Sequence, residues 1–414
     1  MKKETTPAEK PSSVVFQGLE DLVRTHVQQL IQRILNEEVT DLLGREKSER
    51  RSTVDPEKGY RNGFGKPRKL TLGCGTITVK RPRVRGLDER FESRILPLFV
   101  KRTEAVNDLL PQLYLHGLAH GDFDLALRGL LGEDAPISGS TVARLKEQWK
   151  GEFEEWAARD LSDAEVVYLW ADGVYVKAGL EKEKAAVLVL VAGLSDGRKV
   201  VLALRSGQRE SSASWAELLR DLKRRGMNCP KLVIADGHLG LWGALTDVFP
   251  EAGEQRCWNH RMINILDKIP KSRQAQALMI LKAIPRAEKK ADAEKLRTKF
   301  QDWCRKKGLE DASRAIDTDW NRMVSFFDFP KEHWIHLRTT NIIESPFAAL
   351  RLRTDAAKRF RKVENATAVI WKMLMIAESK FRRLNAPHLL KQVVVGVKFE
   401  DGIEIKRGSK AIPA

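Results

Sequence analysis

One short pattern occurs twice in this chain, and it restricts the fold more than any other feature. An apolar run over 166–171 leads to Asp172, another over 231–235 leads to Asp236, and a glycine follows each aspartate. Each run is too short for a typical helix and stops at a turn residue, so each is predicted to be a buried strand. Ligands collect at the carboxyl ends of strands in open α/β sheets. The two carboxylates are therefore expected at neighbouring strand ends, where their oxygens suit Mg²⁺ or Mn²⁺.

The Asp-Gly pair has a second interpretation, because it is also the strongest short hairpin signal. Strand-like runs over 166–171 and 174–179 lie on either side of the first pair. Taken alone, this pair could be a turn without chemistry. The repetition of the same pair in the same context at Asp236 favours a chemical role for both aspartates.

The region around these runs alternates strands with helices. Further strands are predicted over 185–192, 199–205 and 254–258, and helices over 212–225 and 238–248. Strands that first pair locally and then alternate with helices indicate a mixed sheet with helices on its faces. The predicted fold class is therefore mixed α/β.

A chain of 414 residues is long enough for about two or three domains. In order, the predicted parts are a disordered N-terminus (1–13), an N-terminal helix with a basic hairpin region (14–110), a helix-turn-helix-like region (111–160), the first part of the core (161–262), a helical insertion (263–335), the second part of the core (336–385) and a C-terminal tail (386–414). Apolar residues at spacings of three and four between Phe16 and Leu35 predict a helix whose apolar stripe is either core or a dimer interface. The tail contains one strand-like run, Val393–Val397.

The chain is strongly basic, with 73 lysines and arginines against 56 acids and a net charge of +17. This balance favours a polyanionic partner, most commonly nucleic acid, with an anionic membrane surface as the alternative. No apolar run reaches the length of a membrane span, and the N-terminus leads into no signal-peptide core. Four widely separated cysteines suit a reducing cytoplasm.

The positive charge is concentrated in one stretch that contains no acid. Its basic residues are Arg61, Lys66, Arg68, Lys69, Lys80, Arg81, Arg83 and Arg85. Alternating apolar residues and two glycines between 70 and 79 predict a hairpin within it. Because the charge has a single sign, we expect a surface that contacts phosphates rather than an ordinary solvated face.

A helix-turn-helix is predicted after this stretch. Asp124–Leu131 has the pattern of a short helix, Gly132–Ser138 of a turn, and Ser140–Lys150 of a second helix. The second helix would be the recognition helix, with Arg144 facing outward. Such strings also occur in plain helical domains, so the DNA-binding interpretation depends mainly on charge.

Four blocks of sequence resemble those of the Mutator-type insertion-sequence transposases. They occur in the family's order at Trp170–Lys177, Val233–His238, Gln255–His260 and Arg338–Glu344. Together with the N-terminal part, the resemblance covers roughly 15–385. These enzymes are bacterial DDE recombinases, so the resemblance implies a ribonuclease-H-like catalytic core that is interrupted by an all-α insertion and preceded by a mainly helical DNA-binding region.

The resemblance also implies which residues perform the chemistry. Asp172, Asp236 and Glu344 would be the catalytic triad that binds two Mg²⁺ or Mn²⁺ ions. Arg351, seven residues after Glu344, matches the basic residue that often follows on the same helix. Arg353 and its basic neighbours would hold the DNA backbone, unless they form only a solvated helix face.

The implied function is a transposase that binds the terminal inverted repeats of its own element, cleaves DNA and transfers strands. Its partners would be double-stranded DNA at the repeats and at the target, and a homodimer or higher oligomer on DNA, with no membrane. It would act in the bacterial cytoplasm, at the nucleoid. The alternatives are a ribonuclease-H-like nuclease without strand transfer and a helix-turn-helix regulator, although no glycine-rich cofactor loop supports a ligand-sensing regulator.

Three smaller features of the blocks allow more than one interpretation. Cys257 and His260 provide two ligands, whereas a structural zinc site requires four. A structural role in the core is therefore favoured over zinc binding. The spacing of Asn341 and Glu344 fits a capping box, in which Glu344 would start a helix without any chemistry. Pro346 fits this helix only in its first turn.

Overall fold

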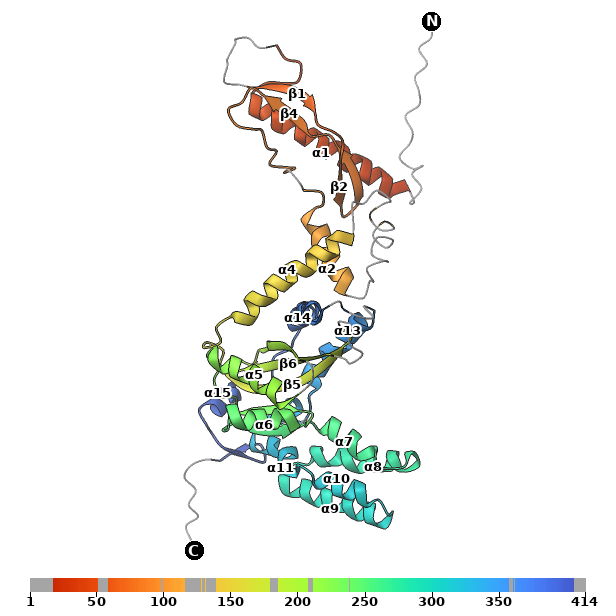
Figure 1. The fold of residues 1–414 in the computed structure, drawn as a ribbon, viewed down its shortest axis with the longest axis vertical. Helices are drawn as coiled ribbons and strands as arrows, with labels where there is room; N and C mark the ends of the chain where they lie inside the picture. The colour runs from red at the N-terminus through yellow and green to blue at the C-terminus, as the bar shows by residue number, and fades with distance from the viewer. Residues whose placement is uncertain are drawn as a thin grey trace. The chain divides into compact units, whose positions relative to one another are not determined.

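The structure is a computed structural model that describes residues 18–50, 59–97, 100–115, 128, 131, 139–178, 185–207, 211–237, 239–356, 360 and 362–405. The chain divides into two compact units, Met1–Leu145 and Lys146–Ala414 (Figure 1). The predicted disordered N-terminus, almost all of the first helix of the helix-turn-helix and its whole turn lie outside the described residues.

The N-terminal unit begins with the predicted long helix, α1 (Leu19–Leu43), which ends at Gly44 in the left-handed conformation that favours glycine (φ 60°). Only the C-terminal half of its apolar stripe is buried, through residues such as Leu35 and Val39. Leu22 and Leu30, in the other half, are 41% and 44% exposed. The apolar stripe is therefore part of the core in the C-terminal half of α1 and exposed to solvent in the N-terminal half.

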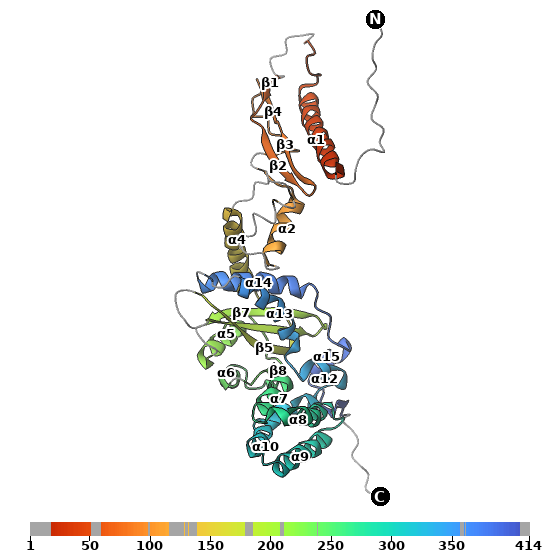
Figure 2. The ribbon, with the colours of Figure 1, turned by 90° about the vertical axis from the view of Figure 1, so that its right-hand side faces the viewer.

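The predicted hairpin is confirmed as β2 (Arg68–Leu72) paired antiparallel with β3 (Gly75–Val79). Its apolar side packs against α1 in a small core of Leu35, Leu70, Ile77, Val79 and Leu96. A second antiparallel pair joins β1 (Tyr60–Phe64) to β4 (Pro82–Arg85). Figure 2 shows α1 running along one side of these strands. The sequence predicted one hairpin, and the structure adds a second pair beside it.

Two helices follow, α2 (Glu104–Leu115) and α4 (Gly139–Ala158). The predicted recognition helix is the first half of α4, which continues without a break to Ala158. Arg144 is exposed, in agreement with its predicted outward direction, and Trp149 is buried.

The C-terminal unit contains a five-stranded sheet in the order β7-β6-β5-β8-β9. Its strands are β5 (Val166–Val176), β6 (Ala185–Leu194), β7 (Lys199–Gly207), β8 (Leu232–Ala235) and β9 (Gly253–Arg256). The first three pair antiparallel in sequence order, whereas β8 lies parallel to β5 and β9 parallel to β8. The predicted mixed α/β class is therefore confirmed.

The structure corrects one strand boundary that matters for the site. Asp172 and Gly173 do not form a turn, because β5 continues through them and pairs them with Val189 and Leu188 of β6. The two strands predicted over 166–171 and 174–179 are therefore a single strand, β5, which ends at Val176. Long pairing with the apolar β6 outweighs the local preference of Asp-Gly for a turn.

Helices cover both faces of the sheet. On one face, α5 (Ser212–Arg224) and α6 (Leu239–Val248) pack in a common core with alternate residues of β5, including Leu169 and Ala171. Ser211 caps α5, because its side chain accepts a hydrogen bond from the backbone N–H of Ser214. On the other face, α13 (Asn341–Ala356) packs against β5 and β6, and α14 (Val363–Glu378) against β7 (Figure 2).

Helices also fill most of the chain between β9 and α13. They are α7 (Trp258–Leu266), α8 (Lys271–Ala283), α9 (Lys290–Lys306), α10 (Glu310–Asp317), α11 (Trp320–Met323) and α12 (Trp334–Leu337), with 3₁₀ turns η3 (Ile284–Arg286), η4 (Ser325–Asp328) and η5 (Lys331–His333). Figure 1 shows α8, α9 and α10 lying together, and their contacts agree. Aromatic residues such as Phe300, Phe326 and Trp334 are fully buried among them.

The tail differs from its prediction. Val393 belongs to helix α15 (Pro387–Val394), so the predicted strand over Val393–Val397 is wrong. Leu390 and Val393 lie three residues apart and are both buried, which is helical rather than strand spacing. A short hairpin of β10 (Phe399–Glu400) and β11 (Ile403–Glu404) follows. Among the helices that the structure describes, none is long and apolar enough to cross a membrane.

Candidate active site

The two aspartates of the repeated pattern lie at the same level of neighbouring parallel strands. Ala171 of β5 pairs with Ala235 of β8, and each alanine directly precedes one of the aspartates. Adjacent strands are about 4.8 Å apart, so the backbones of Asp172 and Asp236 are neighbours. Asp236 follows the last residue of its strand, as predicted, whereas Asp172 lies inside β5.

Strand alternation directs both aspartates to one face of the sheet. Ala171 and Ala235 belong to the core that contains α5 and α6. Successive strand residues point to opposite faces, so Asp172 and Asp236 face the side that α13 covers. Trp170, which has the same parity as Asp172, confirms this direction by donating its indole N–H to the carbonyl of His336 at 3.0 Å. Both aspartates are half-buried.

The backbone beyond β8 depends on Gly237. Its φ of +99° is one that side chains rarely adopt, and a Cβ there would collide with the Arg256 guanidinium. Arg256 uses this space to donate its Nε–H to the carbonyl of Asp236 at 3.3 Å, and its Nη1 to Asp319 at 2.5 Å. The arginine therefore fixes the backbone that carries Asp236.

Glu344 lies in the first turn of α13, but not in the predicted capping box. Asn341 is already helical, and its side-chain oxygen accepts a hydrogen bond from Asn259 at 2.9 Å. The carbonyl of Thr340 accepts the N–H of Glu344 at 3.0 Å, and the Thr340 hydroxyl donates to the Glu344 carboxylate. The capping-box prediction is wrong, because Asn341 is the first residue of the helix and Thr340 is the residue before it that accepts the first helical N–H groups.

Pro346 lies in the second turn of α13, beyond the first-turn position that the sequence suggested. A proline there cannot donate its backbone nitrogen to the preceding turn. Ile343, Phe347 and Leu350, on one face of this helix, are at most 1% exposed. Burial of this face holds α13 in a helical conformation despite the proline.

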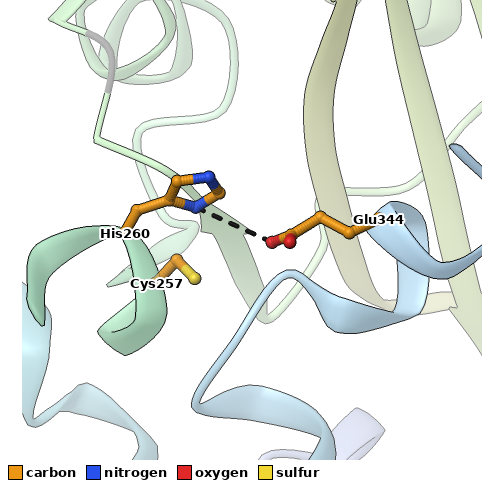
Figure 3. A group of neighbouring side chains, drawn as sticks. All are labelled: Cys257, His260 and Glu344. Atoms are coloured by element: carbon orange, nitrogen blue, oxygen red, sulfur yellow. Dashed lines mark ion pairs between the residues drawn. The ribbon is translucent and has the colours of Figure 1, made fainter. Parts of the chain in front are cut away.

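Cys257 and His260 lie against Glu344, which the sequence did not predict (Figure 3). The buried Cys257 Sγ accepts a hydrogen bond from the N–H of Thr340 at 3.4 Å, and the hydroxyl oxygen of Thr340 lies 3.2 Å from the same sulfur. The Nδ1 of His260 is 3.7 Å from a carboxylate oxygen of Glu344. Residues more than 80 apart therefore form one group, and no local pattern in the sequence could reveal this contact.

The group also changes the charge of His260. A hydrogen bond with Cys257, followed by the charges of Cys257, Glu344 and Asp236, raises the pKa of His260 to about 9 against the opposing effect of burial. The ring is therefore an imidazolium at neutral pH. It places a positive charge close to two of the three predicted catalytic carboxylates.

The donor set decides which metals could bind here. The ligand atoms of Cys257, His260 and Glu344 lie within 4.8 Å of one another, the one such group among the residues that the structure describes. Three donors fall short of the four of a structural zinc site. Asp172 and Asp236 offer the hard oxygens that Mg²⁺ prefers. Among the described residues, the oxygens of Asp172, Asp236 and Glu344 do not form an equally tight group. The Glu344 carboxylate contacts Thr340 and His260.

The predicted DNA-binding residues of the N-terminal unit fall into two sets. The first set is bonded within the unit: Arg61 donates to the Thr40 hydroxyl at 2.6 Å, Arg68 to backbone carbonyls of 97 and 100, and Arg81 to the carbonyl of Phe91. The second set is exposed and consists of Lys66, Lys69, Lys80, Arg83 and Arg85. The first set stabilises the unit, and the second remains accessible to a polyanion.

The basic residues of α13 also differ from one another. Arg351 is exposed, whereas Arg353 is only 2% exposed. A side chain this deeply buried offers a DNA backbone little surface, and the contact predicted for Arg353 stays a prediction. Arg351 remains available.

Comparison with known proteins gives a consistent result. A family model described as Transposase, Mutator family matches residues 2–383. The transposase for insertion sequence element IS6120 of Mycolicibacterium smegmatis is 43% identical over 310 residues, covering 74% of this chain and 95% of that protein. The transposase for element IST2 of Acidithiobacillus ferrooxidans is 38% identical over 67% of this chain and 94% of its own length. The transposase for element IS406 of Burkholderia multivorans is 30% identical over 90% of this chain and 95% of its own length.

Proposed function

This chain belongs to the Mutator family of transposases, and we propose that it binds the terminal inverted repeats of its own insertion sequence, cleaves DNA there and transfers the strands to a target. The reaction would take place in the bacterial cytoplasm, on the DNA of the nucleoid. A transposase must hold two DNA ends together, so a homodimer or higher oligomer on DNA is part of the proposal.

The catalytic residues in this proposal are Asp172, Asp236 and Glu344, on a core of the ribonuclease-H-like type. The observation that carries it is the pairing of Ala171 with Ala235, which brings the two aspartates to one level of neighbouring strands. The packing of α13 on β5 supports Glu344 as the third carboxylate. Three carboxylates on one face of a sheet are a suitable oxygen-rich set for divalent metal.

Two Mg²⁺ or Mn²⁺ ions, when bound, would stabilise the attacking and leaving oxygens of an in-line displacement at phosphorus. The nucleophile would be water in cleavage and a DNA 3′-hydroxyl in strand transfer. Asp172 and Asp236 would hold these ions through their carboxylate oxygens, and Arg256 would keep Asp236 in position through its backbone. No covalent intermediate on a side chain is required.

The proposal assigns DNA binding mainly to the N-terminal unit. The exposed side chains of Lys66, Lys80, Arg83 and Arg85 provide positive charge, and Arg144 is exposed on the predicted recognition helix. A regulator would need this surface but not the carboxylates, and a nuclease would need both but not strand transfer. The catalytic assay can therefore separate the three functions.

The test is cleavage and joining of labelled terminal DNA by the full-length protein in Mg²⁺. Asp172→Asn and Asp236→Asn each remove one metal-binding charge, so we expect loss of cleavage by orders of magnitude with DNA binding intact. Joined 3′-ends from the unaltered protein distinguish a transposase from a nuclease. Cleavage that persists in Asp236→Asn would refute the assignment of this residue.

A further inference from the structure

A cavity of about 170 Å³ lies next to the start of α13. Its walls come from the first turns of α7, the end of α8, the 3₁₀ turn η3 and the two residues before Thr340. Pro285 contributes an apolar wall, and the charged lining residues are Lys282, Arg286 and Arg338. The cavity therefore lies between the helical insertion and the segment that carries Glu344.

The lining of this cavity is positively charged and contains no aspartate or glutamate. Within the described ranges of the chain, no hydrogen bond or ion pair joins the side chain of Lys282, Arg286 or Arg338 to a carboxylate. The Nε of Arg338 is buried without a hydrogen-bond partner. Cations that converge without a counter-charge repel one another, so the lining is suited to an anion.

Arg338, one of the lining residues, packs against two aromatic rings. Its guanidinium lies 5.1 Å from the ring centroid of Phe326 and 5.4 Å from that of Trp334. Its carbonyl accepts the N–H of Trp258 at 2.9 Å. Arg286 lines the same cavity, and burial, followed by the charge of Arg286, lowers the pKa of Arg338. A preorganised planar fork loses little freedom when it binds an anion.

The cavity is also coupled to the candidate active site. Asn259, in its wall, donates to the side chain of Asn341 at 2.9 Å, and Thr339 precedes the threonine that bonds to Glu344. An anion held by Arg338 would therefore lie only a few residues from the third carboxylate. The same short segment would position both.

We propose that this cavity binds one backbone phosphate of the DNA substrate and thereby aligns the strand with Glu344. This inference rests on the proposed function and adds a substrate subsite to it. Guanidinium groups bind phosphate through two parallel hydrogen bonds, and Lys282 adds a point charge. The phosphodiester of a bound strand is the anion that fits a DNA-cleaving enzyme, and free phosphate is the competing source of the same chemistry.

The test compares Arg286→Gln with Lys299→Gln in the full-length protein. Both side chains are exposed cations of the helical insertion, and Lys299 lies on α9 outside the cavity lining. Each phosphate contact adds about 0.9 to the slope of log affinity against log salt. Arg286→Gln should lower the slope for terminal DNA by about 0.9, so that between 50 and 200 mM salt it loses about 3.5-fold less affinity than the unaltered protein. Lys299→Gln should keep the original slope.

Arg338→Lys provides a second variant, because lysine keeps the positive charge but lacks the planar guanidinium that forms two parallel hydrogen bonds with a phosphate. We expect a raised KM for DNA cleavage with little change in kcat, which a general folding defect would not produce. Equal slopes for Arg286→Gln and the unaltered protein would overturn the proposal.

Calorimetry with inorganic phosphate separates the two sources of the anion. Phosphate binding that depends on Arg286, together with an unchanged DNA slope, would assign the cavity to the free ion and overturn the DNA subsite. If the unaltered protein neither binds nor cleaves terminal DNA, the proposed function fails and this inference fails with it. If the unaltered protein cleaves terminal DNA but Arg286→Gln has the same salt slope, the phosphate subsite is refuted and the proposed function is not affected.

Discussion

Replacing Glu344 with glutamine separates a catalytic role from a structural one at this position. Glutamine keeps the shape of the side chain and an oxygen that can accept from the Thr340 hydroxyl. It removes the negative charge, and with it the ion pair with His260 at 3.7 Å. If Glu344 is the third metal ligand, catalysis should require this charge, whereas folding should not.

The stability cost follows from the exposure of the two partners. Their side chains are 31% and 35% exposed, so solvent screens the pair. Partly exposed ion pairs are worth about 0.2–1 kcal/mol. In a unit of this size such a loss corresponds to a decrease in Tm of about 2–4 °C at most. Cleavage, in contrast, should decrease by orders of magnitude.

The assay pairs thermal unfolding without metal with cleavage of labelled terminal DNA in Mg²⁺. Glu364→Gln is the matched control, because Glu364 is an exposed acid in the first turn of α14 and its loss raises the net charge equally. We expect the control to cleave normally. A Glu344→Gln protein that cleaves near the unaltered rate would refute the reasoning, and the third carboxylate would then be another residue.

Two further outcomes follow from the surroundings of Asp236 and Glu344. Gly237→Ala should destabilise the protein by about 1–3 kcal/mol, measured by urea unfolding, because φ is positive and Arg256 fills the space; unchanged stability would contradict the need for glycine at this position. Cys257→Ala should lower the pKa of His260 from about 9 towards 6.5 in an NMR titration. Since the folded-state pKa is raised, the stability from the imidazolium is present below pH 6.5 and is lost as the pH rises through 9. An unchanged titration would exclude Cys257 as its cause.

The sequence predicted the parts of the fold that depend on local pattern. The strand leading to Asp236, the helices on either side of it and the N-terminal hairpin have clear periodicity, and burial on one face follows from it. The continuation of β5 through Asp172 could not be predicted, because Asp-Gly suits both a turn and a paired strand. Pairing with β6, which is a tertiary interaction, decided between them.

The residues of the candidate site could be predicted from the sequence, but the contacts between their side chains could not. The blocks identified Cys257, His260 and Glu344 separately, and only the fold brings their side chains together. Similarly, a single-signed charge run could not reveal that Arg61 is bonded to α1 while Lys66 is exposed. Both distinctions depend on residues distant in sequence, so neither leaves a local signal.

The same contacts explain how a helical insertion can interrupt the core without separating its catalytic parts. The N–H of Cys257 donates to the carbonyl of Ala235 at 2.7 Å, which ties the start of α7 to the residue before Asp236. The N–H of Trp258 donates to the carbonyl of Arg338 at 2.9 Å, so the chain leaves and re-enters the core at one point. Cys257 then accepts from Thr340, next to the helix of Glu344. Because the two ends of the insertion are joined to each other, the distance between Asp236 and Glu344 depends on these few bonds and not on the length of the helices between them.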